Sequence, residues 1–307
     1  MNTVGALSRS SPSPAGTVAR PDPLPRRPRL RGARELWQRF CRNRGALVGL
    51  IVLLAFFGIA LVAPLATTYN PEVTRIEDKL LAPSPAHLLG TDHLGRDILA
   101  RLAYGARYSL LIGFAAVGLG LVVGVPLGAV SGFYGGWLDL VIQRVIDVFL
   151  SFPGFLLALS LVAVLGVGIE NVILAVGLGV VPAFVRLTRA STISIRSRAF
   201  VDAARAAGAS GPAIIVRHVL PNALAPVVIQ ATLGLGATLL TAAGLGFLGL
   251  GVQQPTPEWG AMLGEGRTYI FSNPNLATFP GVAIFLTVLC FNLAGDGLRD
   301  ALDPLLS

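Results

Sequence analysis

The chain has 307 residues, of which 53% are hydrophobic and only 13% charged, with a mean hydropathy of +0.70. This composition excludes an ordinary soluble domain and makes the membrane the better solvent. Only Cys41 and Cys290 are present, so no disulfide framework is expected. The net charge of +8 comes from basic residues beside apolar runs. We therefore attribute this charge to the orientation of the chain in the membrane and to contact with anionic lipid, and not to nucleic-acid binding.

Six apolar runs approach or exceed the roughly 20 residues that a helix needs to cross a bilayer. They are 46–66, 109–133, 148–165, 172–185, 223–252 and 279–295, the fourth being short. The first run lies behind a long tail without a clear cleavage site, so we expect it to be retained. The sequence therefore predicts an all-α, polytopic membrane protein with six transmembrane helices.

The basic residues predict which side each loop occupies. Ten arginines lie between Arg9 and Arg44, against only Asp22 and Glu35, so the N-terminus is expected in the cytoplasm. With six spans, the C-terminus and the loop 186–221, which carries six arginines, are also inside. The first outer loop, 67–107, holds five basic residues, interleaved with five acids.

Residues 1–33 are rich in Ser, Pro and Arg and are expected to form a disordered cytoplasmic tail, followed by a permease domain over 34–305. Between Arg34 and Arg44, apolar residues recur at helical spacing among arginines, which predicts a short interfacial helix before the first span. In the outer loop, Asp97 and Arg101 are spaced as a helical ion pair. We interpret that loop as having a structural role, with a role as a gate or as a receptor contact as the alternative.

Glycine recurs every fourth residue in the second span, at Gly120, Gly124, Gly128 and Gly132. One helix face without side chains predicts close packing against a neighbouring helix, either in this chain or in a second permease. Prolines at positions 126, 153, 182 and 226 lie in or at the ends of spans, where a missing amide donor permits a bend.

Energy-converting and catalytic motifs are missing from the sequence. The six predicted spans have no charged residue in their interior, whereas ion-driven transporters usually place one there. The only lysine, Lys79, is not part of a P-loop, and neither a zinc-protease nor a nucleophile-elbow motif is present. The sequence therefore predicts a non-catalytic chain without a metal or cofactor of its own, driven by a separate protein.

The loop 186–221 contains an Ala-rich stretch, Ala199 to Ala207, that favours a short cytoplasmic helix ended by Gly208 or Gly211. Its candidate coupling residues, which offer small side chains and one ion pair to a partner, are Val201, Asp202, Ala203, Ala204, Arg205, Gly208, Ala209, Ser210 and Pro221.

Asp202-Ala203-Ala204, then Gly208, then His218-Val219-Leu220-Pro221 resembles the coupling motif of ATP-binding-cassette (ABC) importer permeases. Asp202 replaces the usual Glu and His218 the usual aliphatic residue. Further landmarks are similar to the C-type permease of dipeptide/oligopeptide importers over about residues 34–305. They are Leu89-Gly90-Thr91-Asp92-x-x-Gly95-Arg96-Asp97, Tyr104-Gly105-Ala106-Arg107, Pro255-Thr256-Pro257-Glu258-Trp259-Gly260 and Phe291-Asn292-Leu293-Ala294-Gly295-Asp296-Gly297-Leu298-Arg299-Asp300.

This resemblance implies a type I ABC importer permease fold in a bacterial inner membrane and a pathway shared with a B-type permease. It also implies two cytoplasmic ABC ATPase subunits, which would bind ATP and Mg, and an extracytoplasmic peptide-binding protein. Nickel and glutathione importers share the landmarks and remain alternatives for the substrate. A secondary transporter and a membrane scaffold are the alternatives from other classes.

Overall fold

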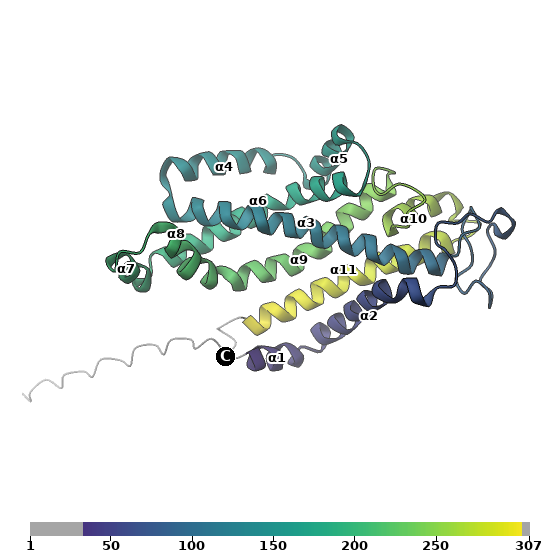
Figure 1. The fold of residues 1–307 in the computed structure, drawn as a ribbon, viewed down its shortest axis with the longest axis horizontal. Coiled ribbons are helices and arrows are strands. Elements are labelled where there is room, and N and C mark those ends of the chain that lie inside the picture. The colour runs from purple at the N-terminus through teal and green to yellow at the C-terminus, as the bar shows by residue number, and fades with distance from the viewer. Residues whose placement is uncertain (1–32, 303–307) are drawn as a thin grey trace, which may run out of the picture.

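The computed structural model describes residues 33–302, and this range is built from helices (Figure 1). The elements are α1 (Ala33–Arg42), α2 (Arg44–Ala66), η1 (Ile76–Asp78), α3 (Ile98–Tyr134), α4 (Gly136–Leu150), α5 (Gly154–Leu165), α6 (Ile169–Arg196), α7 (Ala199–Ala206), α8 (Gly211–Ile214), the π-helical segment η2 (Ile215–Val219), α9 (Leu220–Phe247), α10 (Trp259–Gly266), η3 (Arg267–Tyr269) and α11 (Asn275–Leu302). The predicted tail 1–33 lies outside the described residues, except that Ala33 begins α1.

Five helical stretches are long and apolar enough to cross a membrane: α2, α3, α6, α8 with α9, and α11. The pair α4 and α5 brings the number to six if the two helices count as one bent span. The all-α polytopic prediction is thus confirmed. A continuous third span over 148–165 is wrong, because the chain bends by 87° between Leu150 and Gly154. Pro153 lies at this bend, and a proline disfavours helical geometry in the residue before it.

The spans form a layered bundle (Figure 1). Helix α2 lies along α11, α11 along α9, and α9 contacts both α3 and α6, which form the most extensive helix pair. α4 lies outside α3, on the side away from α2. Helix α7 is at one end of the bundle, with α1 and the end of α11 on the same side, and α10 is at the other end.

The glycine stripe of α3 lies against α6 of the same chain. A Cβ atom added at Gly124 would lie 2.6 Å from the Phe184 Cβ, and one added at Gly128 would lie 2.5 Å from the Val185 carbonyl oxygen. Equivalent close approaches occur at Gly120 and Gly132. The two helix backbones therefore approach to a separation that only glycine permits.

The outer loop ends earlier than predicted. Helix α3 begins at Ile98, so the last ten residues of the predicted loop 67–107 are helical. Asp97 caps this helix, with its Oδ1 accepting the Ala100 N–H at 2.7 Å, while its Oδ2 lies 2.9 Å from His87 Nδ1. Asp97 therefore does not form the predicted pair with Arg101. N-capping satisfies a free helix donor, which favours this position over a side-chain pair.

A buried charge cluster joins this loop to α10. Arg96 contacts Asp92 at 2.6 Å and Glu265 at 3.0 Å, and Arg101 contacts the same acids at 3.5 and 3.4 Å. Both arginines are only 1% exposed. Two acids thus compensate two buried arginines, as buried charges require. His93 places a ring nitrogen near the two carboxylates, within 4.8 Å, but the arginines already occupy the carboxylate oxygens that a metal would need.

Glu258 fastens α10 to α3. Its Oε1 accepts hydrogen bonds from the Ser109 hydroxyl at 2.9 Å and the Gly260 N–H at 2.8 Å, and its Oε2 accepts the Ala261 N–H at 2.8 Å. Burial raises the pKa of the Glu258 carboxyl, and these hydrogen bonds oppose the shift. The indole N–H of Trp259 donates to the Leu102 carbonyl at 2.9 Å. The Glu258-Trp259 pair therefore forms a structural connection, or joint, between α10 and α3.

Candidate functional site

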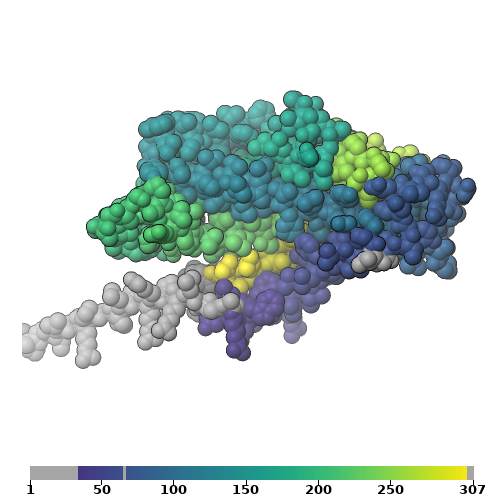
Figure 2. Space-filling view, in the orientation of Figure 1, coloured from purple at the N-terminus to yellow at the C-terminus, as the bar shows by residue number. Residues whose placement is uncertain are grey.

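Between α6 and α9 a short helix, α7, projects from one end of the bundle (Figures 1 and 2). The predicted loop 186–221 is mostly helical: α6 continues through Arg196, and α8 and η2 fill 211–219. Only the short connections 197–198 and 207–210 are not helical. The site is consequently more rigid than a long loop would be.

Local sequence sets both ends of α7. Arg198 has an extended backbone, so the helix restarts after a break that follows α6. At the other end the Ala209 N–H donates to the Ala204 carbonyl at 3.0 Å and the Gly208 N–H to the Arg205 carbonyl at 2.9 Å. These two bonds form a Schellman motif, in which Gly208 adopts a positive φ of 81°.

An apolar cluster fixes the base of α7 to the bundle. Val201 is fully buried against Ile195 at the end of α6, with Phe133 of α3 packed against the same cluster. The other buried members are Ile214, Val219 and Ala223. The Arg196 guanidinium donates to the Gly132 and Phe133 carbonyls at 2.9 and 3.1 Å, which ties the ends of α3 and α6 together. Phe133, Ile195 and Arg196 were not among the predicted coupling residues.

The opposite face of α7 is open to solvent (Figure 2). Among the predicted coupling residues, Ala204 is half-buried, and the exposed ones are Asp202, Ala203, Arg205, Gly208, Ala209, Ser210 and, on the first turn of α9, Pro221. Arg205 donates to Asp202 at 2.9 Å and lies over the Phe133 ring, 5.5 Å from its centroid. An exposed pair contributes at most about 1 kcal/mol, so its main effect is to orient Arg205.

Ion pairs join α4 to the part of α6 that lies beyond the predicted span 172–185. Arg189 donates from Nε and Nη2 to the two oxygens of Asp139, each at 2.6 Å. Arg186 donates to Asp147 at 2.8 Å, with Arg144 at 3.8 Å from the same carboxylate. Acids on α4 thus compensate these arginines, and helical structure continues past the predicted start of the loop at position 186.

Two family models match the chain. "Binding-protein-dependent transport system inner membrane component" covers residues 124–307, and "N-terminal TM domain of oligopeptide transport permease C" covers residues 33–83. The chain belongs to the binding-protein-dependent transport permeases.

Individual relatives of this permease cover nearly its whole length. It is 49% identical over 271 residues to the dipeptide transport system permease protein DppC of Alkalihalophilus pseudofirmus, covering 88% of this chain and 89% of the relative. Identity is 45% to the glutathione transport system permease protein GsiD of Pectobacterium atrosepticum, with coverage of 88% and 90%. It is 44% to the di/tripeptide permease DppC of Pseudomonas aeruginosa, with coverage of 99% and 98%. The predicted resemblance to C-type peptide permeases is confirmed.

The permease also shares its fold with a solved structure. An inward-facing MetNI methionine ABC transporter chain superimposes with a TM-score of 0.55 and 23% identity, over 66% of this chain and 97% of that chain. This likeness supports the fold, and the type I ABC importer architecture is confirmed. The chain is a multi-pass membrane protein of a transport family.

Proposed function

We propose that this permease is one of two membrane subunits of an ATP-driven importer of dipeptides or oligopeptides, and that α7 couples it to an ATPase subunit. The observation that carries this proposal is the two-sided character of α7. Val201 holds one side in the bundle, while small and polar side chains leave the other side open. A partner surface can approach such a face closely.

In this proposal, other subunits supply the energy for transport. ATP and Mg would be bound by two cytoplasmic ABC ATPases, and a B-type permease would complete the pathway. An extracytoplasmic binding protein would deliver the peptide. The family description, which names binding-protein-dependent transport, supports this assembly. ATP-dependent closure of the ATPases would then displace α7 and shift the equilibrium between inward-facing and outward-facing states.

The proposed orientation places α1, α7 and the end of α11 in the cytoplasm of a bacterial cell. Figure 1 shows these three elements toward the same end of the bundle, as an even number of spans requires. The arginine-rich segments on this side agree with the positive-inside rule. Reporter fusions at positions 33 and 302 should both give cytoplasmic signals.

Replacement of Gly208 by Val tests the coupling function. Valine disfavours a positive φ, so the Schellman end of α7 should be distorted. Gly249 offers a matched control, because it closes α9 in the same motif with φ of 79° at the opposite end of the bundle. In proteoliposomes with the full complex, Gly208→Val should hydrolyse ATP with reduced peptide uptake. Gly249→Val should retain the ratio of uptake to hydrolysis.

A second coupling variant replaces Asp202 and Arg205 together by Ala, which removes the ion pair and the contact of Arg205 with the Phe133 ring but keeps the buried Val201. Wild-type uptake per ATP in both this variant and Gly208→Val would refute the role of α7. Uptake that an ion gradient drives without ATP would refute the importer assignment and favour a secondary transporter.

Glutathione is the second candidate substrate, supported by the 45% identity to GsiD. Competition between a labelled dipeptide and reduced glutathione in the same vesicles separates the two. Mass spectrometry of ligand retained by the purified binding protein is an independent measurement. A nickel chelate in that protein would instead support a metal importer.

A further inference from the structure

Helix α1 approaches the bundle at the point where the first apolar span begins. Asn43 alone separates α1 from α2, and its Oδ1 caps α2 by accepting the Ala46 N–H at 3.1 Å. Its Nδ2 donates to Asp300 near the end of α11, at 3.0 Å. The junction is therefore fixed at the start of the apolar span, beside the end of α11.

α1 has the two faces of an interfacial helix. Phe40 is buried with Ala46 and Ala301, which fastens the helix to the bundle. Trp37 stacks on Phe40, with ring centroids 5.9 Å apart, yet remains 54% exposed. Tryptophan is enriched at the level of lipid headgroups, so an exposed Trp beside the start of a span indicates contact with the membrane surface.

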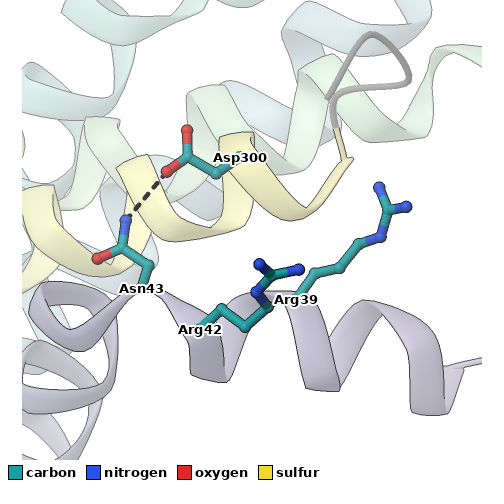
Figure 3. Close-up of a pocket in the computed structure, with 4 residues that line it drawn as sticks. All are labelled: Arg39, Arg42, Asn43 and Asp300. Atoms are coloured by element: carbon teal, nitrogen blue, oxygen red, sulfur yellow. Dashed lines mark hydrogen bonds between the residues drawn. The ribbon is translucent and has the colours of Figure 1, made fainter. Parts of the chain in front are cut away.

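A cleft of about 390 Å³ opens between α1 and α11, lined by Arg39, Arg42, Asn43 and Asp300 (Figure 3). Within residues 33–302, neither arginine forms an ion pair. Asp300, the one acid among the described lining residues, accepts a hydrogen bond from Asn43. These four residues carry two positive charges and one negative charge, and both positive charges belong to guanidinium groups with fork-shaped donors.

We propose that Arg39 and Arg42 bind the phosphate of an anionic phospholipid headgroup. Guanidinium groups bind phosphate through paired N–H donors, which makes arginine well suited to this ligand. The cleft lies directly before the apolar span, where headgroup phosphates lie, and the exposed Trp37 favours a lipid over a soluble anion as the source of that phosphate. The cytoplasmic orientation proposed above only identifies the leaflet, and the lipid site does not depend on peptide transport.

Native mass spectrometry of the purified complex tests this site directly. Wild-type complex should retain phosphatidylglycerol in preference to phosphatidylcholine. Arg39→Gln with Arg42→Gln should weaken phosphatidylglycerol binding by about 30-fold, since each arginine near an anionic lipid contributes about a fivefold gain in affinity. Arg39→Lys with Arg42→Lys should recover part of the binding, because the charges return without the fork geometry.

A matched control separates a defined site from general attraction of basic residues to the membrane. Arg34 and Arg44 are exposed and lie outside the cleft lining. Arg34→Gln with Arg44→Gln removes the same charge from outside the cleft, so phosphatidylglycerol retention should fall by less than in the Arg39→Gln with Arg42→Gln variant. Asp300→Asn removes the opposing acid, so retention should be equal or stronger.

Three results would overturn the proposal. They are equal retention of phosphatidylcholine, equal loss of phosphatidylglycerol in the two arginine-to-glutamine pairs, and displacement of the lipid by inorganic phosphate at millimolar concentration, which would indicate a soluble anion. Because the readout is lipid retention, failure of this proposal is distinguishable from failure of the transport proposal.

Discussion

Replacement of Gly128 by Ala should separate α3 from α6. The added Cβ would lie 2.5 Å from the Val185 carbonyl oxygen and 2.8 Å from the Thr188 Cβ. Ordinary contacts of this kind are about 3.5 Å, so the two helices must move apart by roughly 1 Å. Both nearest atoms belong to the backbone or to the Cβ of a buried residue, which leaves no flexible side chain to rotate away.

The cost follows from overpacking. Inserting a methyl group into a well-packed interface costs about 1–3 kcal/mol, and the gain in helix propensity from Gly to Ala offsets at most about 1 kcal/mol. Displacement of the helices also weakens the neighbouring contacts at Gly124 and Gly132, which lie on the same stripe. We therefore expect a net loss of about 1–2 kcal/mol for Gly128→Ala.

Gly118→Ala is the control, because it is the same substitution on the same helix with no atom within 4 Å of the added Cβ. Thermal unfolding of the purified complex measures both. Gly128→Ala should lower the Tm by about 2–8 °C, whereas Gly118→Ala should leave it unchanged or slightly raised. Equal Tm values for the two variants would show that α3 and α6 do not pack along the glycine stripe.

Three further substitutions test other parts of the structure. Val201→Ala should weaken the docking of α7 by about 2 kcal/mol, because about two buried carbon groups are lost, and limited proteolysis at 207–210 should become faster. Asp139→Asn should destabilise the complex by about 1–3 kcal/mol, since it leaves Arg189 without its carboxylate. Asp147 is exposed, so Asp147→Asn should cost less than about 1 kcal/mol. Equal Tm shifts for the two variants would contradict this ranking. Glu258→Ala should cost about 1–2 kcal/mol through loss of the α10 cap, and the exposed Glu170→Ala should change the Tm little; a neutral Glu258→Ala would argue against the joint between α3 and α10.

Apolar content was sufficient to predict the first and last spans. Helix α2 ends at Ala66, as predicted, because a run without charges has only one favourable environment. The bend between α4 and α5 could not be found in this way. Prolines at 126, 182 and 226 lie inside continuous helices, and only the proline at 153 lies at a break. The missing donor is the same at each position, so surrounding tertiary contacts decide whether the helix continues.

The candidate site was predictable where local sequence determines it. Ala-rich composition and Gly208 specify α7 and its end, and neither depends on distant residues. Its attachment depends on Phe133, which is far away in sequence and has no distinguishing pattern. Arg189 was assigned to a loop for a similar reason. A count of charges cannot show that Asp139, on another helix, compensates it.

The contacts around α7 determine which part of the bundle would follow its movement. Val201 packs on the end of α6, and Arg196 binds the carbonyl groups at the end of α3. Farther along, the glycine stripe of α3 carries no side chains, so the α6 backbone and side chains pack directly against the α3 backbone. α2 has no comparable connection to α7, since it packs mainly on α11 and α3. Displacement of α7 should therefore move α3 and α6 together relative to α2 and α11.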